Sequence, residues 1–150
     1  MPLVLRGPGV PVGSSVSAPT ELLDIYPTLL DLAGLPANPT NEGESLVPLL
    51  ENPDREWPHA AITTYGQNNH GIAVEGYRYI RYEDGSEEYY DHTTDPNEWH
   101  NLASDTTNRA AMDDLARHLP EINATWSALA NIDVYDYFKD QKTRSLRESD

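Results

Sequence analysis

The sequence predicts an α+β fold, in which short helices come first and a four-stranded antiparallel sheet packed by a C-terminal helix follows. Two patterns support this prediction. Apolar residues recur at helical spacing near both ends of the chain, and four runs of β-forming residues, separated by turn residues, lie between them. A chain of 150 residues is long enough for one ordinary domain with a modest core.

The first part of the chain alternates apolar segments with chain-breaking residues. Residues 3–5 are typical of a strand buried on both faces, and a chain that starts in a strand suggests that a preceding part is missing. Residues 19–33 predict two short helices, the second beginning near Pro27, because proline breaks an interior helical turn. Residues 45–50 predict a helical turn capped by Ser45.

The middle of the chain predicts an antiparallel meander. Its strands are expected at residues 60–65, 72–75, 77–82 and 87–91. The dipeptides Glu75-Gly76 and Asp84-Gly85 fit tight hairpin turns, because glycine readily adopts the positive φ that such turns require.

A single apolar stripe near the C-terminus predicts the helix that covers this sheet. Its members follow one another at helical spacing: Met112, Leu115, Leu119, Ile122, Trp126 and Leu129. Pro120 is expected to kink this helix or divide it in two.

The composition argues against several function classes. The chain has 10 Lys and Arg against 25 Asp and Glu, a formal net charge of −15, so neither a nucleic-acid partner nor an anionic membrane surface is expected. It has no cysteine, which excludes disulfides, thiolate metal ligands and a cysteine nucleophile within this sequence. No apolar run approaches the roughly 18 residues of a membrane span.

Five short motifs are spread over residues 1–103. They are MPLVLRGPGV at 1–10, ELLDIYPTLLDLAGL at 21–35, EGESLVPLL at 42–50, RYI with YYD at 78–80 and 89–91, and DPNEWHNLA at 95–103. Together and in this order they resemble the C-terminal third of the type I sulfatases, which belong to the alkaline phosphatase-like superfamily. Within that family the sequence is most similar to bacterial iduronate-2-sulfatase-like proteins.

The resemblance implies a division into three parts. Residues 1–56 would form the C-terminal end of the sulfatase α/β domain, residues 57–132 a C-terminal antiparallel-sheet subdomain, and residues 133–150 a polar tail. It also implies a parent enzyme, periplasmic or extracellular, that hydrolyses the sulfate ester of a sulfated small molecule or glycan.

The same resemblance implies calcium and a formylglycine nucleophile made from Cys or Ser in a C/S-x-P-x-R motif. No such motif occurs here, so no catalytic or metal-binding residue is carried over. The chain alone is therefore expected to be inactive without a missing N-terminal sulfatase domain, because sulfuryl transfer needs a metal and cationic side chains around the transferred group.

Two alternatives stay open. The first is a phosphoesterase or phosphonate hydrolase of the same superfamily, which only the nucleophile motif would distinguish. The second is a free-standing, non-catalytic module that binds carbohydrate or protein and has a closed core. The fragment interpretation predicts instead an exposed apolar surface that includes Leu3, Val4, Leu5, Leu22, Leu29 and Leu30.

Asn69 and His70 are the candidate substrate-binding residues. They lie in a polar stretch, residues 66–71, between two predicted strands, and a sheet fixes such loops while their polar groups stay available. The resemblance implies that this subdomain lies beside the active-site pocket, so we expect both residues to contact the leaving-group sugar or alcohol. The alternative is a solvated histidine in a turn.

A second group of polar residues has the composition of a metal site: Asp91, His92, Asp95 and Glu98. A structural role is favoured, because Asp95-Pro96 is typical of a turn that Asp95 caps, with Glu98 bonding backbone amides. Asp91 is expected to pair with an amide or with an arginine such as Arg78 or Arg81. No metal site is predicted.

Overall fold

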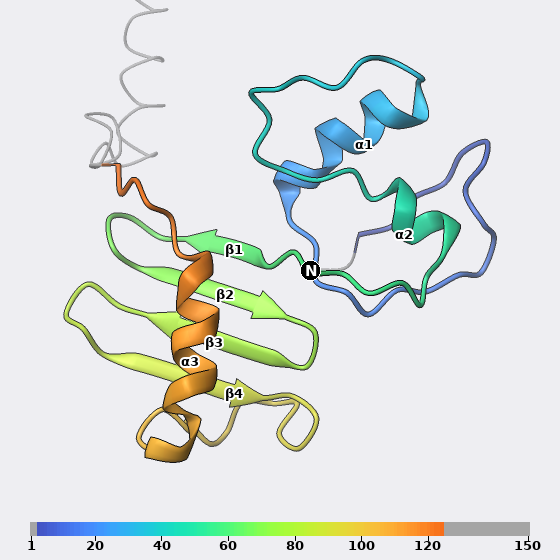
Figure 1. Cartoon of the computed structure of the whole chain (residues 1–150). Helices are drawn as coiled ribbons and strands as arrows, with labels where there is room; N and C mark the ends of the chain where they lie inside the picture. Colours follow the sequence, from blue (N-terminus) through green and yellow to red (C-terminus); the bar gives the residue numbers. More distant parts are fainter. Residues whose placement is uncertain (1–2, 125–150) are drawn as a thin grey trace, which may run out of the picture.

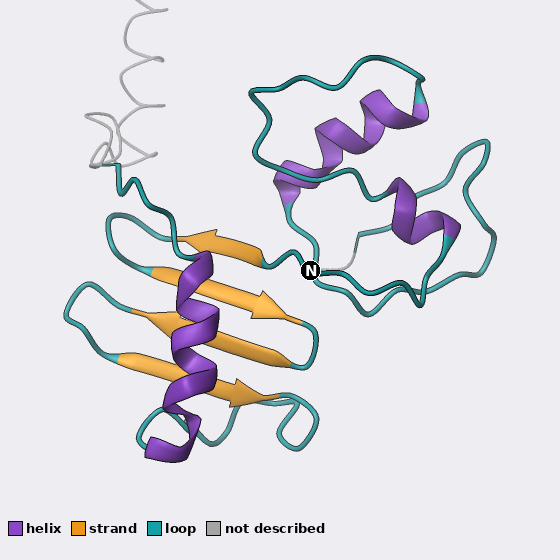
Figure 2. Ribbon diagram, viewed as in Figure 1, coloured by secondary structure: helices purple, strands orange, loops and turns teal. Residues whose placement is uncertain are grey.

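The computed structural model describes residues 3–124, which form a helical N-terminal part and a sheet covered by a helix (Figures 1 and 2). The helical part contains η1 (Leu22–Asp24), α1 (Ile25–Leu32) and α2 (Val47–Glu51). The second part contains β1 (Ala61–Thr64), β2 (His70–Val74), β3 (Tyr77–Arg81), β4 (Glu87–Asp91), η2 (Thr106–Asn108), α3 (Arg109–Leu115) and η3 (Ala116–His118). A search of the described helices finds none with the length and apolar character that a membrane crossing requires.

The four strands are antiparallel neighbours in the order β1-β2-β3-β4, which confirms the predicted meander. The register places Ile72 opposite Tyr79, and Tyr79 opposite Tyr89, so these side chains form a row on one face. α3 lies across that face (Figure 1) and adds Met112 and Leu115 to the same buried cluster. The stripe that predicted a covering helix therefore supplies two of the five buried residues of this cluster.

Both predicted hairpin turns are confirmed. Val74 pairs with Tyr77, so Glu75 and Gly76 form a two-residue turn, and Gly76 has the required positive φ of 81°. The second turn is one residue longer. There Tyr82 donates its N–H to the Ser86 carbonyl oxygen, and three residues lie between this bonded pair. Gly85, the last of the three, has a φ of 83°.

The C-terminal helix is shorter than predicted. Within residues 3–124, helical structure ends at His118, and Pro120 follows the last turn, where it cannot supply the N–H that another turn would need. Leu119 still packs against the core, but Ile122 is 86% exposed and does not continue the stripe. The expected positions Trp126 and Leu129 lie outside the described residues.

The predicted strand at residues 3–5 is wrong for the described chain. These residues pair with no other described strand, and a β-ladder requires a neighbour. The apolar exposure that the fragment interpretation predicted is present at Leu3, Val4, Leu22 and Leu29, while Leu5 and Leu30 are half-buried. Tyr26, Leu32 and Leu35 extend the exposed apolar surface around α1.

A buried polar pair joins α1 to the segment before α2. Asp24 is 5% exposed and accepts hydrogen bonds from the backbone N–H groups of Glu21 and Glu44, both at 2.9 Å. The Thr28 hydroxyl donates to the Asp24 carbonyl oxygen at 2.5 Å and accepts from the Leu46 N–H at 2.9 Å. The motifs at 21–35 and 42–50 are therefore one hydrogen-bonded unit.

Two helix starts differ from prediction, the first by two residues and the second by one. α1 begins at Ile25 and contains Pro27 in its first turn, where backbone N–H groups have no partner within the helix. α2 begins at Val47 with Leu46 at the N-cap position, so the predicted cap at Ser45 is wrong. The Ser45 hydroxyl instead donates to Asp31 at 2.6 Å and accepts from the Val47 N–H at 3.3 Å.

Backbone groups on the outer edge of β4 form hydrogen bonds with the side chain of Asn101, where a fifth strand would otherwise pair. The Asn101 amide oxygen accepts from the N–H of Tyr89 at 3.1 Å, and its NH₂ group donates to the carbonyl oxygen of Glu87 at 3.1 Å. The Leu102 N–H then donates to the Tyr89 carbonyl oxygen at 2.9 Å. The end of the motif at 95–103 thus continues the hydrogen bonding of the sheet edge.

An ion pair ties α3 to β4. Arg109 donates to Glu87 from Nη1 at 2.7 Å and from Nη2 at 3.3 Å, and the Tyr79 hydroxyl donates to the same carboxylate at 2.5 Å. The hydrogen bond from Arg109 lowers the pKa of Glu87 below its usual range. Burial, followed by the hydrogen bond to Glu87, raises the pKa of Tyr79 to about 12. Tyr79 is therefore neutral and Glu87 ionised at neutral pH.

Candidate substrate-binding site

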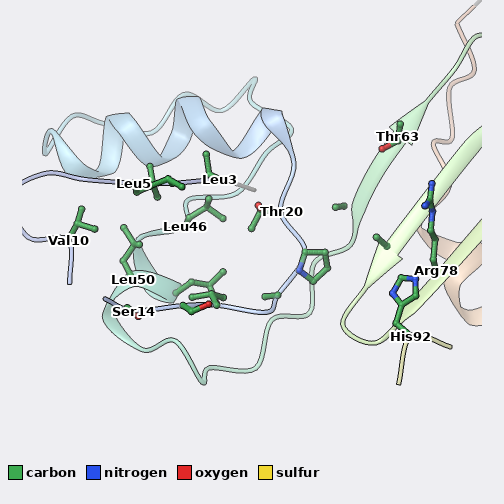
Figure 3. A pocket seen from close by; sticks show the side chains of 18 of the residues that line it. Leu3, Leu5, Val10, Ser14, Thr20, Leu46, Leu50, Thr63, Arg78 and His92 are labelled. Carbon is green, nitrogen blue, oxygen red and sulfur yellow. The ribbon is translucent and has the colours of Figure 1, made fainter. Parts of the chain in front are cut away.

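A cavity of about 750 Å³ lies between the helical part and the face of the sheet that α3 does not cover. Figure 3 places Leu3, Leu5 and Leu50 on one side of it and Thr63, Arg78 and His92 on the other. Most of the residues that line it are apolar. Arg78 and His92 are the ionisable side chains among the residues that line it.

A carboxylate holds these two side chains together. Glu98 accepts from Arg78 Nη1 with both oxygens, each at 3.2 Å, and its Oε1 lies 2.8 Å from His92 Nε2. Burial alone would raise the pKa of Glu98, but the hydrogen bond from His92 and the Arg78 charge lower it below the usual range. Glu98 has a φ of 57°, which is uncommon outside glycine, so the network holds a turn in a strained conformation.

Asp91 and Asp95 form hydrogen bonds within the turns that follow β4. Asp91 accepts from the Thr93 N–H at 2.9 Å, and Asp95 accepts from the His100 N–H at 2.8 Å, which confirms the expected amide bonds. The expected role of Glu98 is wrong, because its carboxylate bonds Arg78 and His92 in place of backbone amides. No group of three or more His, Asp or Glu within residues 3–124 is arranged to hold a metal ion.

His70 lies in β2 and not in the loop that precedes it. It is 2% exposed, on the same side of the sheet as Ile72 and α3, so it points away from the cavity face. Its Nδ1 lies 2.9 Å from the Thr64 hydroxyl and its Nε2 lies 2.8 Å from Asn123 Oδ1. Both ring nitrogens are therefore bonded within the chain. Direct contact with a substrate stays a prediction and would require one of these bonds to break.

Asn69 lies at the end of the β1–β2 loop and is half-buried. Its side-chain NH₂ donates to the Gln67 carbonyl oxygen at 2.9 Å, and its amide oxygen accepts from the Glu83 N–H at 3.2 Å. Glu83 belongs to the β3–β4 turn, so Asn69 connects two loops at the same end of the sheet. Figure 1 shows these two loops side by side.

Asn123 is the residue of this region that sequence reasoning missed. It is 53 residues from His70 along the chain, so no local spacing could pair the two. The predicted apolar stripe passes from Ile122 to Trp126, so it gives no signal at position 123. Only the return of the chain past η3 to the β1–β2 loop brings Asn123 to His70.

Solved structures identify the class of fold. The chain matches a structure described as a complex with its substrate D-glucosamine-2-N,6-O-disulfate, with a TM-score of 0.63 and 27% identity over 72% of this chain and 24% of that one. It also matches the phosphonate monoester hydrolase of Agrobacterium radiobacter, with a TM-score of 0.51 and 27% identity over 63% of this chain and 23% of that one. The α+β fold is that of a C-terminal part of sulfatase-like hydrolases.

The family follows from the sequence comparisons. The model of the family described as N-sulphoglucosamine sulphohydrolase, C-terminal, matches residues 1–125, and the chain belongs to this family. A sulfatase from Formosa agariphila is 49% identical over 95% of the chain, and the Δ4,5-hexuronate-2-O-sulfatase of Bacteroides thetaiotaomicron is 33% identical over 76%. This chain spans 28% of the length of each relative.

The calcium ion and formylglycine that the family resemblance implies do not fit the residues of this chain. The sequence contains neither a cysteine nor a C/S-x-P-x-R motif from which formylglycine could be made. The carboxylates at 91 and 95 are occupied by backbone amides, and Glu98 is occupied by Arg78 and His92. We therefore assign no catalytic step to these groups here.

Proposed function

We propose that this chain is the C-terminal part of a sulfatase that hydrolyses a sulfate ester on a glycan, and that it is inactive without the remaining part. The family match over residues 1–125 carries the proposal. Two related proteins support a glycan as the substrate: one is described in complex with a glucosamine disulfate and the other as a hexuronate sulfatase. A small sulfated molecule remains the simpler substrate of the same class.

The remaining part would supply the chemistry. Sulfuryl transfer needs a nucleophile and a cationic site around the transferred group, which in this proposal are formylglycine and calcium in the N-terminal sulfatase domain. Residues 1–56 would complete that domain. The exposed apolar side chains of Leu22, Tyr26 and Leu29 support this placement, because a contiguous exposed apolar surface marks an interaction site.

Residues 57–132 would form the wall of the substrate pocket. We assign contact with the leaving-group sugar to Asn69 and to the loop that contains it, and a supporting place beside that loop to His70, the first residue of β2. The support is their position: the loop is fixed by a sheet at both ends and is tied to the neighbouring turn through Glu83. Residues 133–150, the expected polar tail, have no assigned role.

Expression of the chain with and without the sulfatase part tests the proposal. We expect hydrolysis of 4-nitrophenyl sulfate and of a sulfated disaccharide only when both parts are present. The chain alone should bind a hydrophobic dye through the apolar surface around α1. A cooperative thermal transition without dye binding would instead support the free-standing binding module.

A phosphonate or phosphate ester is the second candidate substrate. The likeness to a phosphonate monoester hydrolase at 27% identity favours it as a rival, because both reactions can use the same C-terminal fold. Parallel assays with 4-nitrophenyl phosphate and 4-nitrophenyl phenylphosphonate distinguish the two. Higher kcat/KM for either phosphorus ester than for the sulfate would replace the sulfatase proposal.

A further inference from the structure

One side-chain oxygen joins the start of β2 to the loop before it. Asn123 Oδ1 accepts from the Asn68 N–H at 3.3 Å and lies 2.8 Å from His70 Nε2. A backbone N–H can only donate, so this atom of Asn123 acts as an acceptor and His70 Nε2 must carry the hydrogen. In a neutral ring the other nitrogen, Nδ1, then accepts from the Thr64 hydroxyl.

We call the two contacts of Asn123 Oδ1, with Asn68 and with His70, the Asn123 clamp. The loop that this clamp holds, residues 65–69, has an uncommon backbone. Gly66 has a φ of 68° and Asn68 a φ of 62°, both in the left-handed region. Residues other than glycine keep this conformation where their surroundings hold them in it. For Asn68 the holding contact is the hydrogen bond to Asn123. The loop closes where the Tyr65 N–H donates to the Asn69 carbonyl oxygen at 2.9 Å.

We propose that His70 and Asn123 are positioning residues, which hold the loop at residues 65–69 so that Asn69 faces the leaving group. This inference rests on the proposed function. It adds Asn123 and the hydrogen bonds that fix the conformation of the loop. Because His70 is 2% exposed and both ring nitrogens are bonded, it acts on the substrate through the loop. The class of ligand is the sugar that carries the sulfate ester.

Substrate size provides a readout that a purely structural role would not change. Asn123→Ala in the sulfatase-length protein removes the shared acceptor. We expect the KM for a sulfated disaccharide to rise about tenfold, since small displacements of positioning groups have effects of this size or larger. The kcat for the disaccharide and the kcat/KM for 4-nitrophenyl sulfate should not change, because the small leaving group does not reach the loop.

Conservative variants provide the rescue. Asn123→Asp keeps the acceptor oxygen, and His70→Gln keeps an N–H donor toward Asn123, so both should retain the disaccharide KM. His70→Met, which fills a similar volume without hydrogen bonds, should behave as Asn123→Ala. The matched control is Asn97→Ala, at an exposed asparagine in another turn. Equal loss on both substrates, or an unchanged KM in Asn123→Ala, overturns the proposal.

Amide hydrogen exchange separates this inference from the proposed function. Asn123→Ala should speed exchange at the Asn68 amide in the chain itself, whatever reaction the protein performs. If the wild-type protein hydrolyses no sulfate ester, the proposed function fails, while faster exchange still supports the clamp. Unchanged exchange at Asn68 overturns the clamp even in an active sulfatase.

Discussion

Gly43 lies against the backbone of Leu23 so closely that a Cβ at position 43 would stand 2.2 Å from the Leu23 carbonyl oxygen. Glycine is the residue that permits this approach, because it has no Cβ. The approach lets the next residue, Glu44, donate its N–H to Asp24. The glycine of the motif at 42–50 is therefore explained by packing against the motif at 21–35, and not by a turn.

Replacement of Gly43 should destabilise the chain. Gly43→Ala forces backbone atoms apart, and overpacking of this kind costs about 1–3 kcal/mol. Chemical denaturation measures the loss in the free energy of unfolding. Gly7→Ala is the control, because nothing lies within 4 Å of a Cβ at that position. Equal stability of the two variants would mean that the segment at 42–44 can move away without loss.

The hydroxyl of Thr28 should matter more than its methyl group. Thr28→Val keeps the shape of the side chain but leaves the buried Leu46 N–H and Asp24 carbonyl oxygen without this partner. We expect the free energy of unfolding to fall by about 1–3 kcal/mol. Thr28→Ser keeps both hydrogen bonds and should cost less. The free energies of unfolding of the two variants, measured side by side, check the order. A valine variant as stable as the serine variant would contradict it.

The Arg109–Glu87 pair predicts stability that depends on pH. The pKa of Glu87 is lowered in the folded chain, so its contribution is present above the usual glutamate pKa and is lost as the pH falls through the lowered value. Arg109→Met should therefore destabilise the chain at pH 6, by up to about 1 kcal/mol, because the pair is partly exposed to solvent. It should have no such effect at a pH below the pKa of Glu87 in the folded chain.

The control for this prediction is Arg117→Met. Arg117 pairs with Asp114 at 2.8 Å, and both side chains are largely exposed. The difference in free energy of unfolding between wild type and each variant is measured from pH 2 to pH 7. A difference for Arg109→Met that stays constant over this range would show that its contribution does not come from the ionised Glu87.

Asn101 should protect the edge of the sheet. Asn101→Ala removes the partners of the Tyr89 N–H and the Glu87 carbonyl oxygen, and a net cost of about 1 kcal/mol is expected because these groups can turn to water. Hydrogen exchange at the Tyr89 amide should become faster, and an open edge favours self-association. Asn97→Ala serves as the control here too. Unchanged exchange at Tyr89 would contradict the edge role.

Local patterns were sufficient for the sheet. The order of the strands and both turns follow from runs of β-forming residues and from Gly76 and Gly85, because a meander is built from neighbouring segments. Met112 and Leu115 were also predicted in the covering helix, since a helical stripe has to bury its apolar side. The length of that helix was predicted only in part. Pro120 was expected to kink or divide it, and the helical structure that α3 and η3 form ends at His118 although the apolar stripe continues past the proline.

The candidate site needed the tertiary structure. The sequence by itself predicted Asn69 and His70 in a loop between two strands, which holds for Asn69 only, and it determined that no nucleophile motif or cysteine accompanies them. It could not determine which face of the sheet His70 occupies, because a shift of one residue at the start of β2 reverses the face. The fold decided this, and it placed Asn123 beside His70, since hydrogen bonds between residues far apart in sequence depend on how the chain returns.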